Sequence, residues 1–211
     1  MSQLLEADRP RPGLRERKKA KTREAIQEHA LRLFAERGYE ATTIADITDA
    51  AEVSPSTFFR YFPTKEDVAL YDALDPILLA ELAAQPAELS PVGALRAAIR
   101  EVFGGMPSGV LAQQNERAAL VISVPELRMR MLDELVRSMR LFAEVIAKRA
   151  GRDPDDPAVS ALTGAAIGVS IAVWLNAGGL DPDYVGLMDA GLAELEAGFP
   201  GLSGIGDRGL E

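Results

Sequence analysis

Prolines and glycines divide this chain into segments of helix length, and this division most constrains its fold. Within the segments, apolar residues recur at three- and four-residue steps, whereas β-branched runs with alternating polarity are hard to find. The 211 residues are dominated by Ala, Leu, Glu and Arg, a composition that favours helices. The sequence therefore predicts an all-α protein with about nine helices.

Start and stop signals predict where the helices lie. Proline is tolerated in the first turn of a helix, Ser and Thr cap its start, and Gly ends it. Four helices are expected in the first 82 residues, at 15–37, 44–51, 55–62 and 64–82, the last bent or interrupted at Pro76. Five more are expected at 91–103, 109–123, 125–150, 157–176 and 182–197.

The segment VSPSTFFRYFPTKEDV (53–68) holds four of the chain's 12 aromatic residues. Phe58 and Phe62 lie four apart, so they share one helix face and are expected to pack against the preceding helices. Phe59 and Tyr61 point elsewhere. Two short helices joined by a tight link form a helix-turn-helix, whose second helix lies in the major groove of DNA. The alternative is that all four aromatic residues fill a small core.

Charge is unevenly distributed along the chain. Residues 1–65 hold 12 Lys or Arg and 10 Asp or Glu, a net charge of +2, whereas residues 66–211 hold 11 and 22, a net charge of −11. A basic end on an acidic body suits a protein that meets a polyanion with one end. A solvated, flexible basic arm at residues 1–14 accounts for the charge equally well. Because this arm has no signal-peptide pattern, a cytoplasmic location is expected.

Several other classes of site or protein are disfavoured by what the sequence holds. There is no cysteine and one histidine, His29, so neither a metal site nor a cofactor is expected. No carboxylate spacing singles out a catalytic pair, which disfavours a helical enzyme. A non-specific architectural DNA-binding protein would need basic charge over the whole body. The uncharged segment 158–175 is expected to be a helix buried on most sides rather than a membrane span.

Residues 15–70 resemble the DNA-binding domain of the TetR family of transcriptional regulators. The resemblance runs through ALRLFAERGYEATT, IADITDAAEVS and FFRYFPTKEDV. It implies a helix-turn-helix domain at 15–75 and an effector-binding and dimerisation domain at 76–211. It also implies a homodimeric repressor that binds a palindromic operator and is released by a small molecule. Within the family, this stretch of sequence is most similar to actinobacterial-type members, some of which sense acyl-coenzyme A or other lipophilic molecules.

The resemblance also implies which residues bind DNA. Thr43 is expected to contact a phosphate at the start of the second helix. The groove-facing positions are Pro55, Ser56, Thr57, Phe59 and Arg60, and the phosphate contacts that close the site are Tyr61 and Lys65.

The second domain offers weaker signals. Small residues in 157–176 would allow a close helix contact, so this helix and 182–197 are expected to form the dimer interface, through Leu162, Ala166, Val169, Val173 and Leu192. An intramolecular core helix is the alternative. A lipophilic effector is expected to contact aromatic and Met side chains and one polar anchor, namely Phe103, Met106, Arg117, Met139, Phe142 and Trp174.

Overall fold

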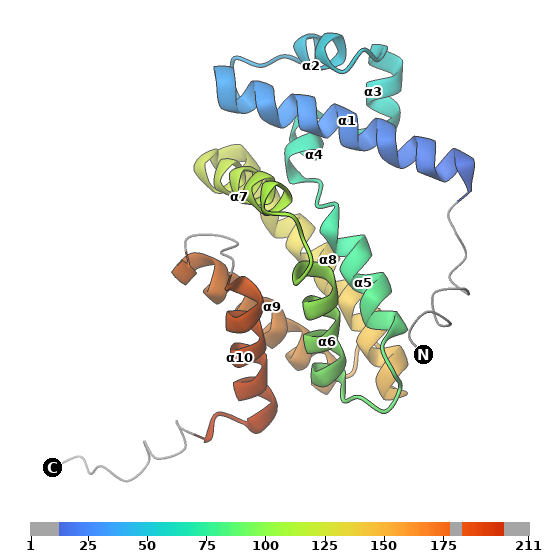
Figure 1. Ribbon diagram of the computed structural model, residues 1–211, viewed down its shortest axis with the longest axis vertical. Coiled ribbons are helices and arrows are strands. Elements are labelled where there is room, and N and C mark those ends of the chain that lie inside the picture. Colours follow the sequence, from blue (N-terminus) through green and yellow to red (C-terminus); the bar gives the residue numbers. More distant parts are fainter. Residues whose placement is uncertain (1–12, 178–182, 201–211) are drawn as a thin grey trace, which may run out of the picture. The chain divides into compact units, whose positions relative to one another are not determined.

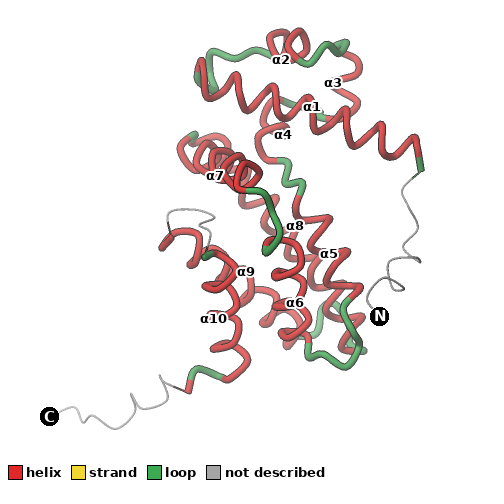
Figure 2. Tube along the Cα trace, in the orientation of Figure 1, coloured by secondary structure: helices red, strands yellow, loops and turns green. Residues whose placement is uncertain are grey.

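The computed structural model describes residues 13–177 and 183–200, which form ten α-helices and no strand (Figure 1, Figure 2). The all-α prediction is confirmed. The helices are α1 (Leu14–Arg37), α2 (Ile44–Ala50), α3 (Pro55–Tyr61), α4 (Lys65–Leu70), α5 (Leu74–Ala84), α6 (Pro91–Phe103), α7 (Ser108–Ser123), α8 (Pro125–Ala150), α9 (Pro157–Ala177) and α10 (Tyr184–Ala197). Most of the basic arm and the expected helix start at Pro182 lie outside the described residues.

The chain divides between Tyr71 and Asp72 into two compact units, which we call the head and the body. The division coincides with a break in the expected helix 64–82, which the structure resolves into α4 and α5. A continuous helix would bring the ring of Pro76 against the carbonyl of Asp72, four residues earlier. Pro76 instead occupies the third position of α5, where a missing N–H costs nothing. The carboxylate of Asp72 accepts the N–H of Leu74 at 2.8 Å.

The head is built around one face of α1. Its buried side chains recur at helical spacing, and buried residues of α2, α3 and α4 complete the core, with Ile26, Ala30, Leu33, Phe34, Ile47, Phe58, Phe62, Val68 and Ala69 as members. Gln27 is the polar member of this face. Its amide nitrogen donates to the carbonyls of Val68 and Tyr71 at 3.0 and 2.7 Å, which ties the end of α4 to α1.

The body packs α5, α6, α8, α9 and α10 around a second core. Two arginines join elements that are distant in sequence. The Arg96 guanidinium on α6 donates to both carboxylate oxygens of Asp189 on α10, at 2.9 and 2.8 Å. Arg149 on α8 donates to the carbonyls of Leu82, Gln85, Pro86 and Leu89, so one side chain holds the whole α5–α6 loop.

Helix α9 is less covered than its sequence suggested. Among the described residues, it is the one helix long and apolar enough to cross a membrane, and 17 % of its apolar window is buried. The expectation of a helix buried on most sides is therefore wrong for the single chain. The reason is that α8 and α10 cover one side of α9, whereas Ile171 and Leu175 on the other side are 43 % and 61 % exposed.

Candidate nucleic-acid interface

Helices α2 and α3 are joined by a tight turn that two backbone hydrogen bonds hold closed. The N–H of Glu52 donates to the carbonyl of Asp49 at 3.3 Å, and the N–H of Val53 donates to that of Thr48 at 3.0 Å. These two bonds make a Schellman motif at the end of α2. Such a motif needs a left-handed residue, normally glycine, but here Glu52 holds a φ of 52°. The turn thus carries a local strain that the helices around it must offset.

Helix α3 has seven residues, too few to be stable alone. Ser54 caps its start, because its Oγ accepts the N–H of Thr57 at 3.1 Å, and Pro55 fits the first turn. Phe58 and Phe62, 0 % and 2 % exposed, anchor its inner face. The expectation that these two aromatic residues fill the core is confirmed. Anchors at both ends fix which side chains α3 turns outward.

The outward face of α3 carries the residues expected to read DNA. Pro55, Ser56 and Arg60 are exposed, and Phe59 is 50 % exposed, although its ring packs edge-on against Phe58 at 5.5 Å between centroids. Thr57 and Tyr61 are partly buried. The structure therefore brings these six side chains together on one short helix. Their individual contacts with DNA stay predictions.

Tyr61 is flanked by two guanidinium groups. The Cζ of Arg60 lies 5.2 Å from the centre of its ring, and the Cζ of Arg23 on α1 lies 5.9 Å away. Arg23 also lies 4.9 Å from the ring of Tyr71. The face of an aromatic ring attracts a cation, so the Tyr61 ring helps to hold both guanidinium groups in place. Positive charge therefore continues from the end of α3 onto α1.

Thr43 is exposed at the first turn of α2. Its Oγ1 accepts the N–H of Asp46 at 3.2 Å, while its own N–H donates to the Asp46 carboxylate at 2.8 Å. The Thr43 hydroxyl also donates to the Asp46 carboxylate. This bond first, the bond from the Thr43 N–H second and a smaller effect of nearby Arg37 hold the pKa of Asp46 below its usual value. Free N–H groups at a helix start suit a phosphate, as expected for Thr43, although the Asp46 charge opposes a close approach.

Lys65 has a structural role that the sequence did not reveal. Its Nζ donates to the carbonyls of Tyr39 and Thr42 at 2.9 and 3.1 Å and lies 4.1 Å from the centre of the Tyr39 ring. An ammonium group has three donors, so one remains for a phosphate. Lys65 thus ties α4 to the loop before α2, and the expected phosphate contact stays a prediction.

The expected effector residues are spread over the body. Phe142 is part of the core, Met106 and Met139 are partly buried, and the Phe103 ring lies 5.3 Å from that of Tyr184. The Nε of Arg117 donates to Gln114 at 3.0 Å, and its Nη2 pairs with Asp72. The indole N–H of Trp174 is buried, and no hydrogen-bond partner for it lies among the described residues.

Sequence reasoning missed two pairs of polar side chains in the body interior. Ser138 on α8 donates to the Asp75 carboxylate on α5, and burial raises the pKa of that carboxyl. The hydroxyl groups of Tyr184 and Ser170 lie 3.2 Å apart, and burial raises the pKa of Tyr184. These pairs join residues that are distant in the sequence, so no local pattern marks them.

The expected dimer residues lie in or against the core of the single chain. Leu192 is 0 % exposed and Ala166 is buried, while Leu162, Val169 and Val173 are partly buried against the same core. A Cβ on Gly191 would lie 2.7 Å from the Cγ1 of Val169, which shows how closely α9 and α10 approach. For Leu192 and Ala166 the geometry favours the intramolecular alternative.

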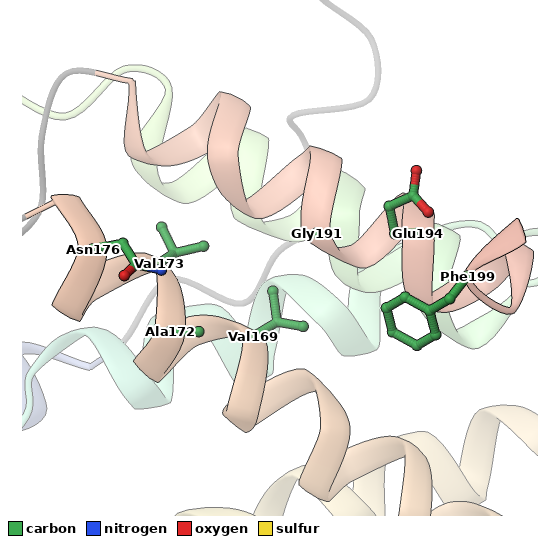
Figure 3. A pocket seen from close by; sticks show the side chains of 7 residues that line it. All are labelled: Val169, Ala172, Val173, Asn176, Gly191, Glu194 and Phe199. Atoms are coloured by element: carbon green, nitrogen blue, oxygen red, sulfur yellow. The ribbon is translucent and has the colours of Figure 1, made fainter. Parts of the chain in front are cut away.

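An open groove of about 500 Å³ lies along α9 and α10 (Figure 3). It is lined by Val169, Ala172, Val173, Asn176, Gly191, Glu194 and Phe199. Two of the expected dimer residues line it, whereas none of the expected effector residues does. The lining of the groove is mostly apolar and includes Val169 and Val173, which the sequence predicts for a helix contact.

A helix-turn-helix head joined to a separate helical body defines a DNA-binding regulator of transcription. The profile described as bacterial regulatory proteins of the tetR family matches residues 26–71, and that of the MftR C-terminal domain matches residues 89–200. The HTH-type transcriptional regulator TcmR of Streptomyces glaucescens is 40 % identical over 152 residues, which are 69 % of this chain and 67 % of TcmR. The chain belongs to the TetR family of transcriptional regulators.

Two solved structures share the fold. The TetR-family repressor FadR of Thermus thermophilus, in complex with lauroyl-CoA, is 24 % identical with a TM-score of 0.53, covering 83 % of this chain and 94 % of FadR. The SmeT–triclosan complex is 18 % identical with a TM-score of 0.57, covering 84 % and 91 %. At these identities the likeness shows the fold alone, whereas the role of a transcriptional regulator comes from the sequence relatives.

Replacing Glu52 with glycine should stabilise the protein. Glycine adopts a positive φ without the Cβ conflict, so the free energy of unfolding should rise by roughly 0.5–1 kcal/mol. Scanning calorimetry of the full chain would measure this as a higher melting temperature for Glu52→Gly. The matched control is Glu52→Gln, which removes the charge but keeps the strain. Equal melting temperatures for the two variants would contradict the strained turn.

Proposed function

We propose that the protein is a homodimeric repressor that binds a palindromic operator in the cytoplasm and is released by a small apolar effector. The observation that carries this proposal is the outward face of α3. There Ser56, Phe59 and Arg60 present a hydroxyl, an aromatic edge and a guanidinium on a helix fixed from behind. Arginine can read guanine with two hydrogen bonds, and apolar surface can contact thymine methyl groups.

The uncovered face of α9 supports the homodimer. Ile171 and Leu175 are exposed on it, with the small residues Gly168 and Ala172 also exposed, and Leu187 on α10 is 40 % exposed. Small residues let helix backbones approach closely, and a second copy would remove this apolar surface from water. We therefore propose this outward face as the interface, in place of Leu192 and Ala166. A soluble dimer accounts for the apolar helix without a membrane.

The effector is proposed to be an apolar molecule with a hydrogen-bond acceptor. The buried indole N–H of Trp174, which has no partner among the described residues, supports this. A buried donor without a partner costs about 1–3 kcal/mol, which an acceptor on a ligand would recover. Related folds have been solved with triclosan in SmeT and with lauroyl-CoA, whose acyl chain is apolar, in FadR. Release from DNA then requires that the effector prefer a conformation that binds the operator less well.

Selection of bound duplexes from a random pool tests whether the protein binds a palindromic operator. Two variants of the head then distinguish a side chain that contacts bases from one that contacts phosphates. Arg60→Ala should weaken binding to the selected palindrome by roughly 1–3 kcal/mol and relax the preference at one position per half-site. Lys65→Ala should weaken binding to all duplexes alike and flatten the salt dependence. Fluorescence anisotropy against matched and mismatched duplexes measures both. Sequence-independent losses for both variants would show that Arg60 reads no base.

Charge on the outward face of α9 should separate the dimer. Ile171→Arg would bury an unpaired guanidinium at the proposed interface, so sedimentation should show a folded monomer with little operator binding. Met129→Arg is the matched control, because Met129 is 78 % exposed on α8. It should leave the dimer intact. An Ile171→Arg variant that remains dimeric would move the interface to another surface.

The single tryptophan should report the effector. Candidate compounds, such as fatty acyl-coenzyme A and triclosan, should change Trp174 emission and release the operator over one concentration range. Trp174→Phe keeps an aromatic ring but removes the N–H, so release should then need roughly tenfold more compound, since one hydrogen bond contributes about 1–1.5 kcal/mol. Release at unchanged concentrations from the Trp174→Phe protein would place the effector away from this side chain.

A further inference from the structure

The first half of α1 is a basic surface that packing does not explain. Every described residue from Gly13 to Lys21 is exposed, and this stretch includes five cationic side chains, Arg15, Arg17, Lys18, Lys19 and Lys21. In Figure 1 the first turns of α1 run beyond the other helices of the head. The buried face of the helix begins only near Ile26. Among the described residues of the head, these two turns of helix are therefore unpacked and carry a concentrated positive charge.

These turns are unfavourable on their own. Cations in the first turns of a helix oppose its dipole, and free helical turns are marginal without packing. Among the described residues, no carboxylate lies within ion-pair distance of Arg15 or Lys19. Glu16 accepts the N–H of Gly13 at 3.2 Å. Residues that reduce the stability of their own helix are expected at functional sites.

The basic surface is continuous with the recognition helix. Arg23 lies over the ring of Tyr61, which Arg60 of α3 flanks from its own side. Residues four and eight positions before Arg23 lie on the same face of α1, and these are Lys19 and Arg15. Arg17 and Lys21 lie about 200° from Arg15 and Lys19 around the helix, on the opposite face. One row of cations thus extends from α3 along α1.

We propose that the row Arg15–Lys19–Arg23 binds the DNA backbone that flanks each half-site, outside the base pairs read by α3. The row spans eight residues, about 12 Å, which corresponds to three or four base pairs. The first turns of α1 hold one carboxylate, Glu16, against five cations, and phosphates on the flank would supply further negative charge. This inference rests on the proposed DNA-binding function and extends its footprint onto sequence-independent contacts.

Two double variants on the same helix test the proposal. Arg15→Gln with Lys19→Gln removes charge from the row, and Arg17→Gln with Lys21→Gln removes the same charge from the opposite face. Both sets of residues are exposed, so thermal unfolding should be unchanged. Each protein is titrated with two duplexes that carry the selected palindrome. One duplex ends at the half-sites and the other extends about six base pairs beyond them.

Wild-type protein and the Arg17/Lys21 variant should bind the extended duplex more tightly than the trimmed one. The Arg15/Lys19 variant should bind both duplexes alike, keep its base preference, and lose about two units of salt slope per head. If the two variants had the same affinities for the extended and trimmed duplexes, the row would contribute only general electrostatic attraction, and the proposal would be overturned. If wild-type protein selected no palindrome, the proposed function itself would fail, a separate and earlier result.

Discussion

The burial of Phe58 and Phe62 is the interaction on which the DNA-binding surface depends. Helix α3 is too short to persist alone, so its shape comes from two aromatic side chains beneath it, the Ser54 cap and the hydrogen-bonded turn before it. Their spacing of four residues fixes the rotation of α3 about its axis. That rotation decides that Ser56, Phe59 and Arg60 face outward. The DNA reading proposed for these side chains therefore depends on core packing as well as on their own chemistry.

The head could be predicted from the sequence because its signals are local. Thr43, Ser54 and Thr64 each cap the helix that follows, and each accepts the N–H three residues later. The aromatic spacing in α3 likewise needs no distant partner. Pro76 was recognised as a disruption, but its effect depended on position. Because Pro76 fits the first turn of a helix, the expected helix 64–82 is divided into α4 and α5, and the structure has ten helices where nine were expected.

The body was predicted less well because its side chains are placed by distant partners. Arg117 pairs with Asp72 across 45 positions of sequence, and Ser138 with Asp75 across 63. Leu192 shows the same dependence on distant partners. Its apolar side chain would fit a core or an interface equally well, and the packing of α10 against α6 places it in the core. For α9, composition showed an apolar helix but could not show which side neighbouring helices leave open.

The separation between Tyr71 and Asp72 has a consequence for synthesis. The head completes its core, from Ile26 to Leu70, within the first 71 residues, while α9 and α10 come last. At about 5–20 residues per second, a ribosome needs roughly 5–25 s to pass from the head to α10. During that time the nascent chain carries a finished recognition helix without the surface through which two copies would join. On the proposed palindromic operator a lone head would occupy one half-site, so unfinished chains would compete poorly with the proposed dimer.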